Sequence, residues 1–497
     1  KGKKMKKSTI SLKGLLFFAV VLSALLAGIL FIVANLQSNL VLQLGAVCLL
    51  YVTAIAYCLL DLKYYIIHFM FLLMIGVFLF NRPIIYYLNN GILQEYSKDT
   101  YQFSFTAIAI SIVAIIIGGM IGKWIATRNQ KTVAKPVNQR FIDKLQQVSF
   151  IAFLFTYPFY VLRLVERYMF RRQTTYYGYY ANFQSKLPYF TYLLSAFMFF
   201  ALCTYLATKP SKKKSLIVLL LYIGANGIHL LIGTRNPFIL AIVFSFVYFF
   251  MRHYTDKSEK WIGKFERFLL GVGTPILMLA MGALNYIRDG ASVKGTSISG
   301  LLIDFLYKQS TSFGALSKGF LYHSALPIRE FRNFTFGPVI EYFTRGSFGN
   351  QLFGTTPFAN TTNSLELALE SNSFAHNISY IAMHKDYLEG HGIGSSYIIE
   401  VYTDFGFIGL ILANILLGML FVTLVNSMYT GKTLKVILSL VILGNLFFMP
   451  RSSFTESFYS LFTMQFWFFM AVLFILSGLL VKKVRYYSHT KDGYINV

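Results

Sequence analysis

Runs of about twenty apolar residues recur along almost the whole of this 497-residue chain, and they constrain its fold more than any motif does. A helix rises about 1.5 Å per residue, so a run of this length can span the hydrocarbon core of a bilayer. With 56% hydrophobic and only 13% charged residues, the chain is too apolar for a soluble domain. Inside lipid only helices and closed barrels satisfy their backbone hydrogen bonds, so we expect an all-α, polytopic helical bundle.

Twelve of these runs are candidate transmembrane helices. They cover roughly residues 14–35, 40–60, 64–80, 104–126, 147–165, 187–208, 215–232, 236–251, 267–287, 404–425, 434–450 and 457–481. The first run is long for a cleaved signal peptide, so we interpret it as a retained helix. The polar block 288–394 then divides the chain into a bundle of nine spans (1–287), a long loop region, and a bundle of three spans with a tail (395–497).

The distribution of charge orients this bundle. When loops are assigned alternately to two sides from a cytoplasmic N-terminus, the lysine-rich loops fall on the cytoplasmic side, as the positive-inside rule predicts. The net charge of +25 therefore reports membrane topology, and we expect no nucleic-acid partner. The same assignment places both termini in the cytoplasm and the block 288–394 outside.

Arginine distinguishes the external side, whereas lysine dominates inside. A guanidinium can donate two parallel hydrogen bonds to a phosphate, so the external set favours an anionic ligand such as pyrophosphate. For any one arginine, pairing with an external acid is the simpler interpretation. Five arginines stand at outer helix ends, in the break 233–237, or within the external loop: Arg163, Arg235, Arg288, Arg345 and Arg451.

The external block has structure of its own. Apolar residues recur at helical spacing in 299–326, which predicts a helix that lies on the membrane. Further along, Glu400 and Asp404 lie four residues apart and share one helical face where the tenth span approaches. A carboxylate pair leading into a span costs free energy unless it is paired or hydrated, so we expect it to face a polar cavity.

Several catalytic motifs are missing from the sequence. There is no GxxxxGK[ST] phosphate loop, no HExxH and no Asp-x-Asp. The first absence argues against ATP-driven transport, and the other two argue against zinc or a carboxylate-held divalent metal. We therefore expect no metal and no cofactor, and a pyrophosphate leaving group would have to be stabilised by arginine.

One stretch runs from His376-Asn-Ile-Ser-Tyr380 through Gly392-Ile-Gly-Ser-Ser-Tyr397 to Glu400 and Asp404-Phe-Gly-Phe-Ile-Gly409. This stretch resembles the Wzy polymerases, which join the repeat units of O-antigen and capsule. The turn Gly233-Thr-Arg-Asn-Pro237, the twelve expected spans and the long late external loop add to the likeness.

The resemblance implies a GT-C-like glycosyltransferase in the cytoplasmic membrane of a bacterium. Its donor would be a growing glycan on undecaprenyl pyrophosphate, and its acceptor a single lipid-linked repeat unit. External arginines would hold the pyrophosphate, and a histidine or carboxylate would act as base. The pyrophosphate would be bound by Arg235, Arg288 and Arg345, with Arg163 and Arg451 as second-rank candidates. The base would be His376 or Glu400, and Asp404 is a further catalytic candidate.

The resemblance also sets the partners and leaves alternatives open. The bilayer is one partner, and a chain-length regulator and a flippase would be compatible with the scheme. A lipid-linked oligosaccharide flippase or transporter is the main alternative function, although the long external loop counts against it. A ligase that moves glycan onto a different acceptor would have the same sequence features as a polymerase.

Overall fold

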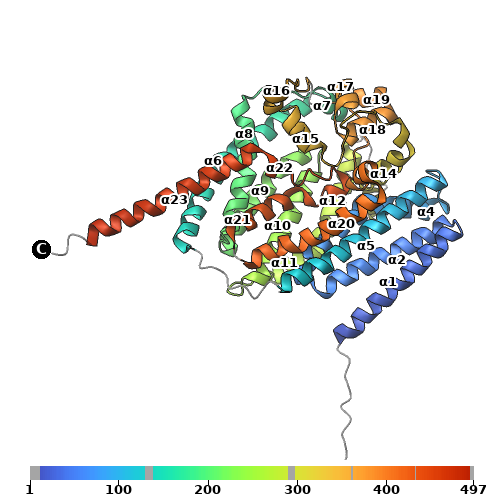
Figure 1. The fold of residues 1–497 in the computed structure, drawn as a ribbon, viewed down its shortest axis with the longest axis horizontal. Coiled ribbons are helices and arrows are strands. Elements are labelled where there is room, and N and C mark those ends of the chain that lie inside the picture. Colours follow the sequence, from blue (N-terminus) through green and yellow to red (C-terminus); the bar gives the residue numbers. More distant parts are fainter. Residues whose placement is uncertain (1–11, 129–137, 289–296, 360–361, 431, 493–497) are drawn as a thin grey trace, which may run out of the picture.

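The computed structural model describes residues 12–128, 138–288, 297–359, 362–430 and 432–492, and its regular structure is helical throughout (Figure 1). Within this described part, eleven helices are long and apolar enough to cross a membrane. The long helices form one bundle, and short helices gather over one end of it (Figure 1). The prediction of an all-α, polytopic membrane bundle is confirmed.

The candidate spans follow the apolar runs of the sequence. They are α1 (Leu12–Leu36), α2 (Leu40–Leu60), α3 (Leu62–Ile75) continuing through η1 (Gly76–Phe80) and α4 (Asn81–Asn90), α5 (Lys98–Arg128), α6 (Gln139–Arg172), α8 (Tyr189–Ala207), α9 (Lys212–Ile232), α10 (Asn236–Thr255), α20 (Tyr397–Thr430), α21 (Thr433–Leu446) with η5 (Met449–Arg451), and α23 (Met464–Asp492).

The ninth of the twelve expected spans, 267–287, is not among these eleven. Here the chain forms three consecutive pieces: α11 (Lys264–Phe268), the π-helical turn η3 (Leu269–Gly273) and α12 (Thr274–Arg288). Pro275 has no amide hydrogen to donate to the preceding turn, and such positions commonly carry a π-helical irregularity. The expected span 267–287 lies within a continuous helical stretch from 264 to 288, which the π-helical turn divides.

Between α12 and α20 the chain is folded into short helices. They are α13 (Ile298–Gln309), α14 (Thr311–Leu321), η4 (His323–Ala325), α15 (Gly337–Thr344), α16 (Ser347–Phe353), α17 (Leu365–Glu370), α18 (Phe374–Met383) and α19 (Lys385–Leu388). We call residues 326–394 the cap. The short helix α7 (Tyr176–Asn182), which follows α6, lies at the same end of the bundle (Figure 1).

The segment 299–326 is helical as predicted, but the expected position on the membrane surface is wrong for its second helix, α14. The chain breaks at Ser310, and α14 is buried inside the bundle. Phe320 stacks on Phe103 of α5 with ring centroids 4.2 Å apart, and the Ser317 and Ser104 hydroxyls lie 3.1 Å apart. Small residues along α14 allow this close approach, since a Cβ on Gly319 would lie 2.5 Å from Ile399 of α20.

Helices α5 and α20 pack backbone against backbone. A Cβ at Gly118 would overlap the carbonyl of Ile415, and one at Gly418 would overlap the carbonyl of Ile115. Such glycine contacts are typical of helix pairs in membranes, where close van der Waals packing has to replace the hydrophobic effect. Buried Asn414 adds a hydrogen bond across the pair, from its Nδ2 to Ser111 Oγ at 3.3 Å.

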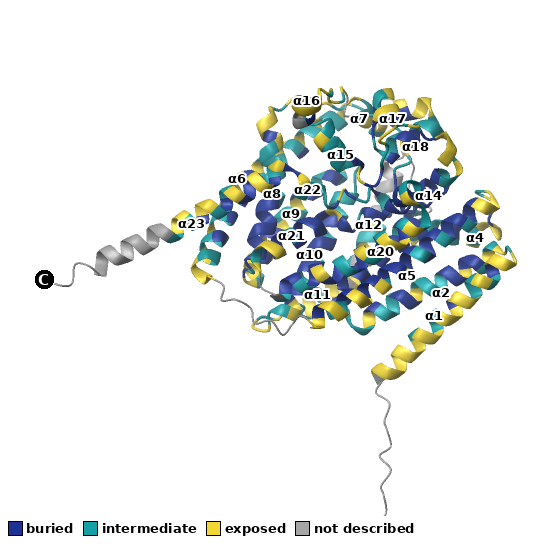
Figure 2. Cartoon of the chain, in the orientation of Figure 1, coloured by how far each residue is buried: buried dark blue, intermediate teal, exposed yellow. Residues whose placement is uncertain are grey.

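The exposed faces of the bundle are apolar, as a membrane protein requires. Figure 2 shows burial concentrated in the middle of the bundle, whereas α1 is exposed along most of its length. Large side chains such as Phe18 on α1 and Phe155 on α6 are 64% and 61% exposed. In water such surfaces would be costly, whereas in a bilayer they contact lipid. The chain is therefore a multi-pass membrane protein.

We predict that Gly418→Leu disrupts the α5–α20 contact, because its side chain would occupy space held by the backbone of α5. Overpacking of this kind costs about 1–3 kcal/mol or more. Thermal unfolding of the detergent-purified protein, followed by size-exclusion chromatography, should show a lower midpoint. Gly478→Leu is the matched control, since a Cβ at this glycine of α23 meets open space. Equal midpoints for both variants would contradict the proposed packing.

Candidate active site

A cavity of about 500 Å³ lies between the cap and the bundle. Its walls come from α15, the turn before α18, the link 394–395, the start of α20, and the turn 448–459 that follows α21. Three carboxylates line it, those of Glu341, Glu400 and Glu456, together with the guanidinium of Arg451. The fold thus brings together two residues that the sequence analysis singled out, Glu400 and Arg451, from different spans.

Glu400 lies in the first turn of α20 and faces this cavity, as expected, although it is only 2% exposed. Its Oε1 accepts a hydrogen bond from Ser395 Oγ at 2.7 Å, and its Oε2 accepts one from the Phe454 amide at 3.0 Å. The carboxylate therefore fastens two walls of the cavity to each other, the link before α20 and the turn after α21. Both oxygens of this buried group therefore have a hydrogen-bond donor.

The other two carboxylates are less tightly held by donors. Burial raises the pKa of Glu341, although the Asn372 amide donates to its Oε1 and partly offsets this effect. Glu456 is accessible in the cavity wall, and the surrounding protein raises its pKa by desolvation, while a hydrogen bond with Ser452 lowers it less. Both groups are consequently stronger bases when ionised than a carboxylate in water.

Glu341 was not among the residues that the sequence analysis proposed. The one signal it offers is its setting, a lone acid in the otherwise apolar run Pro338-Val-Ile-Glu-Tyr-Phe343. On α15 that acid faces the cavity while its apolar neighbours pack elsewhere. Nothing in the sequence pairs it with Glu456, because their proximity depends on how the cap folds over the turn after α21.

Three arginines from separate breaks in the bundle converge on α13. The Arg451 guanidinium donates from Nη1 to the Gln309 carbonyl at 2.8 Å. Arg235, in the turn between α9 and α10, lies over the Phe305 ring at 5.9 Å, and Arg82 lies over the Tyr307 ring at 4.9 Å. Arg82 is neutralised by an ion pair with Glu95, whereas Arg235 and Arg451 add positive charge next to α13. Arg288 is the last residue of α12, which packs on α13, but its side chain lies outside the described residues.

The turn that holds Arg235 agrees with the prediction of a break between two apolar segments. Helix α9 ends at Ile232, Gly233 adopts a left-handed conformation with φ +97°, and α10 begins at Asn236. His229 Nδ1 and Thr234 Oγ1 lie 2.9 Å apart and brace the turn. Glycine is required at position 233 because an L side chain is strained at this φ.

His376 lies in α18, within the cap. Its Nδ1 is 2.8 Å from the Tyr387 hydroxyl, which donates its own proton to the Ser364 carbonyl at 3.2 Å. We therefore assign the hydrogen of this bond to Nδ1, which makes Nε2 the basic nitrogen. Burial lowers the pKa of His376, so the ring is neutral near pH 7. The cavity wall includes its neighbours Ser373 and Ala375.

Asp404 has a different environment from Glu400, although both lie on the first two turns of α20. Its Oδ2 accepts hydrogen bonds from the Phe334 amide at 2.9 Å, the Thr335 amide at 2.7 Å and the Thr335 hydroxyl at 2.7 Å. These bonds tie the start of the cap to the bundle just before α20 kinks at Gly406, whose φ is +64°. The geometry is that of an anchor for the cap.

The cap arginines are held by partners around the turn before α18. Arg345 forms an ion pair with Glu370 at 3.1 Å and lies over the Phe358 ring at 4.3 Å. Arg329 donates from Nη2 to the Ser371 carbonyl at 2.7 Å and to Asn377 Oδ1 at 3.1 Å. The turn 371–375, which forms one cavity wall, is therefore shaped by charged hydrogen bonds.

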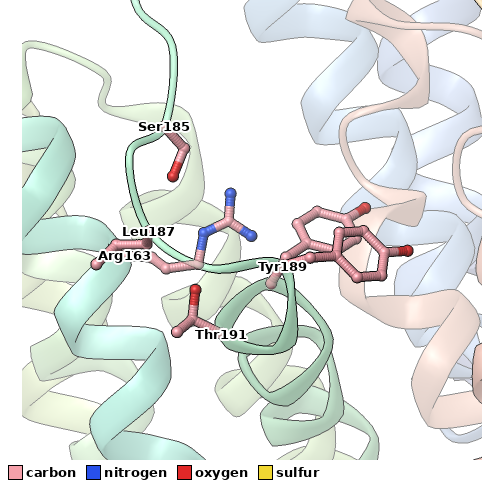
Figure 3. Close-up of a pocket in the computed structure, with 6 residues that line it drawn as sticks. Arg163, Ser185, Leu187, Tyr189 and Thr191 are labelled. Carbon is pink, nitrogen blue, oxygen red and sulfur yellow. The ribbon is translucent and has the colours of Figure 1, made fainter.

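Arg163 lies outside this cavity. It lines a separate groove of about 300 Å³ together with residues 185–192, at the contact of α6 and α8. Figure 3 shows its guanidinium directed between Ser185 and the tyrosine rings, and it lies 4.7 Å from the centre of the Tyr192 ring. The groove opens beside Tyr189, which is 67% exposed. The structure therefore does not bring Arg163 together with Glu400 and Arg451.

The chemistry that the cavity supports is acid–base catalysis next to an anion site. A cluster of three or more histidine, cysteine or acidic residues that could hold a metal ion does not occur in the part of the chain that the structure describes. The carboxylates can accept a proton, and the arginine can stabilise developing negative charge.

Comparison with known families agrees with the resemblance seen in 374–409 and extends it. The chain matches the family described as O-antigen polysaccharide polymerase Wzy over residues 15–484, which is nearly its whole length. A search of curated proteins and a search of solved structures each found no match.

We predict that Asp404→Ala releases the start of the cap, because three hydrogen bonds to one carboxylate oxygen are lost. In purified protein, limited trypsin digestion should then cleave after Arg332 several times faster than in the unsubstituted protein. Asp386→Ala, at an exposed position of α19, is the control and should leave the rate unchanged. If Asp404→Ala also leaves the rate unchanged, the anchor is not what holds this segment.

Proposed function

The chain belongs to the O-antigen polysaccharide polymerase family Wzy, and on this basis we propose that it joins lipid-linked oligosaccharide repeat units on the external face of a bacterial cytoplasmic membrane. The donor is a glycan on undecaprenyl pyrophosphate, and the acceptor is a lipid-linked repeat unit. The observation that carries the proposal is the cavity beneath the cap, where three carboxylates and Arg451 meet. Such a site suits glycosyl transfer with a pyrophosphate leaving group.

In the proposed reaction an acceptor hydroxyl attacks the anomeric carbon of the donor. The bond from that carbon to the pyrophosphate oxygen breaks, and its electron pair leaves with undecaprenyl pyrophosphate. The hydroxyl proton passes to a base. Arg451 is placed to stabilise the negative charge that develops on the leaving group, which is where preorganised donors contribute most. Arg235, whose guanidinium lies over the Phe305 ring of α13, adds positive charge near Gln309, to which Arg451 donates, and we assign Arg288 to the pyrophosphate as well.

Among the carboxylates, Glu456 is the best placed to act as the base. It is accessible in the cavity, and desolvation raises its pKa toward the working pH. Glu400, which already accepts hydrogen bonds on both oxygens, holds the cavity walls in position. We assign Asp404 the role of cap anchor, and His376 stays a second candidate base because its Nε2 is a free acceptor among the described residues.

The remaining arginines have supporting roles in this scheme. Arg345 is partly neutralised by Glu370 and shapes the cavity wall. We assign Arg163, which lines a groove beside exposed Tyr189, to the phosphate of an approaching lipid-linked substrate. The external position of the cap follows from the positive-inside rule, which puts the lysine-rich loops at the opposite end. The proposal includes metal independence, because arginine takes the part of a metal ion.

The proposal is tested by reconstitution. The protein in liposomes, supplied only with an undecaprenyl-pyrophosphate-linked repeat unit, should produce a ladder of glycans on a gel. Neither nucleotide nor metal should be needed, so EDTA should leave the rate within about twofold. Liposomes without the protein are the control.

Other results would point to other functions. Flipping of a labelled lipid-linked repeat unit without a ladder would favour a transporter. Transfer of one glycan to an added acceptor without elongation would favour a ligase. Strong inhibition by EDTA that added Mg²⁺ or Mn²⁺ reverses would contradict the arginine-based mechanism.

We predict that Glu456→Gln lowers the rate of ladder formation by about 100-fold or more, because a general base is lost. In the unsubstituted protein, the rate should fall on acidification at a pH above the ordinary glutamate value of 4.5, since the raised pKa means that the carboxylate is protonated sooner. This acid limb should disappear from the residual rate of the variant. Glu389→Gln, an exposed cap carboxylate, is the matched control and should retain both the rate and the limb.

A retained rate in Glu456→Gln would contradict the assignment of the base. In that case His376→Gln would be the next variant, since the Nε2 of this histidine is the second candidate base.

A further inference from the structure

A second and larger cleft, of about 810 Å³, lies at the cap end of α6. This volume is within the range of ligand pockets, about 300–1,000 Å³. It is lined by seven consecutive residues that join α6 to α7: Arg171, Arg172, Gln173, Thr174, Thr175, Tyr176 and Tyr177. Two guanidiniums, an amide, two threonine hydroxyls and two phenol rings make up this lining. In contrast to the candidate active site, it has no carboxylate.

The two arginines give the cleft a net positive charge. Arg171 is held in place by a hydrogen bond from its Nη1 to the Thr174 carbonyl at 2.6 Å. Arg172 is exposed, and its guanidinium lies 6.0 Å from the centre of the Tyr168 ring. Throughout the described residues, neither arginine forms an ion pair with a carboxylate. Two neighbouring guanidiniums without an acidic partner favour a carboxylate or phosphate ligand.

The tyrosines supply a rigid aromatic surface beside this charge. The Tyr177 ring stacks on His391 of the cap with centroids 3.6 Å apart and planes at 15°. The turn at Gly390 makes this contact possible, because a Cβ there would overlap the Tyr177 carbonyl. Tyr177 is still 43% exposed, although its ring also contacts that of Tyr176, with centroids 5.4 Å apart. The apolar face of a sugar ring packs well on such a surface, while the hydroxyls bind polar neighbours.

Helix α7 links this cleft to the candidate active site. Tyr176, which lines the cleft, is hydrogen-bonded to Tyr180 one turn further along, and their ring centroids lie 5.1 Å apart. Tyr180 in turn lies close enough to Arg451 to interact with it electrostatically. The cleft and the cavity at Arg451 are therefore both close to α7.

We propose that the cleft of residues 171–177 binds an acidic part of the glycan, several sugars away from the one that reacts, and that the repeat unit accordingly carries a carboxylate or phosphate group. This inference rests on the proposed function and adds to it the charge class of the substrate and a second point of attachment. A glycan held at two points dissociates more slowly, so the cleft would also favour repeated additions to one chain.

A membrane lipid fits the cleft less well than a glycan does. Its lining is polar, and α7 belongs to the layer at the cap end together with α16 and α17 (Figure 1). The groove at Arg163 shows the contrast, since exposed Tyr189 and Phe190 stand beside it and provide contact for acyl chains.

Binding of defined oligosaccharides to the full-length protein in lipid nanodiscs tests the proposal. The probes are a fluorescent tetrasaccharide with two glucuronates and the neutral tetrasaccharide of N-acetylglucosamine. We expect the acidic probe to bind at least tenfold more tightly, and to weaken as salt is raised. Arg171→Ala combined with Arg172→Ala should reduce that binding at least tenfold. Arg140→Ala, an exposed arginine near the opposite end of α6, is the control and should bind as before.

If the double variant fails to fold, Arg172→Glu alone reverses a charge at an exposed position and should also abolish the preference for the acidic probe. The proposal is overturned if the acidic probe does not bind, if both probes bind equally, or if the arginine variants bind like the unsubstituted protein. Full displacement of the acidic probe by an equal concentration of inorganic pyrophosphate would assign the cleft to the lipid phosphate instead, and would also overturn it.

The ladder assay separates this inference from the proposed function. If the unsubstituted protein makes a ladder, the double variant should still form the first linkage but give products of markedly shorter average length. Products of unchanged length would overturn the inference and leave the polymerase standing. If the unsubstituted protein makes no ladder, the polymerase proposal fails, whatever the binding experiment shows.

Discussion

The contact between α5 and α20 is the constraint on which the rest of the structure depends. In a bilayer, helices gain little from hiding apolar surface from each other, so close packing at glycines has to hold them. Gly118 and Gly418 provide this approach, and Asn414 fixes its register with a buried hydrogen bond. The first turns of α20 then carry Glu400 and Asp404 to fixed positions, from which the cavity walls and the cap are held.

The cap converts this rigid pair into a site. Asp404 holds the start of the cap. Glu341 lines the cavity from α15 in the cap, whereas Glu456 and Arg451 line it from the bundle. Burial raises the pKa of Glu341 and Glu456, and the Arg451 guanidinium lines the same cavity. Glu400, whose two oxygens both accept hydrogen bonds, holds the cavity walls. Glu341 and Glu456 accept fewer hydrogen bonds and can therefore take part in proton transfer.

Much of this could be predicted from the sequence, because membrane crossings and helix breaks depend on local composition. The span pattern, the break before Arg235 and the candidacy of Glu400 and Arg451 were all accessible in this way. The position of α14 was not, since apolar spacing is the same for a helix on a membrane and for one buried in a bundle. Glu341 was missed for a similar reason, because a lone acid shows no partner until the cap is folded.

The sequence by itself determined that this is an all-helical, multi-pass membrane protein, and its motifs placed it among the polymerases, since lipid imposes length and hydropathy on every crossing. Only the tertiary structure decided which polar groups share a cavity. In the folded chain, Glu400 and Arg451 line one cavity, Asp404 accepts hydrogen bonds from the start of the cap, and Arg163 lines a separate groove. Such pairings arise from contacts between segments distant in the chain, and no local pattern encodes them.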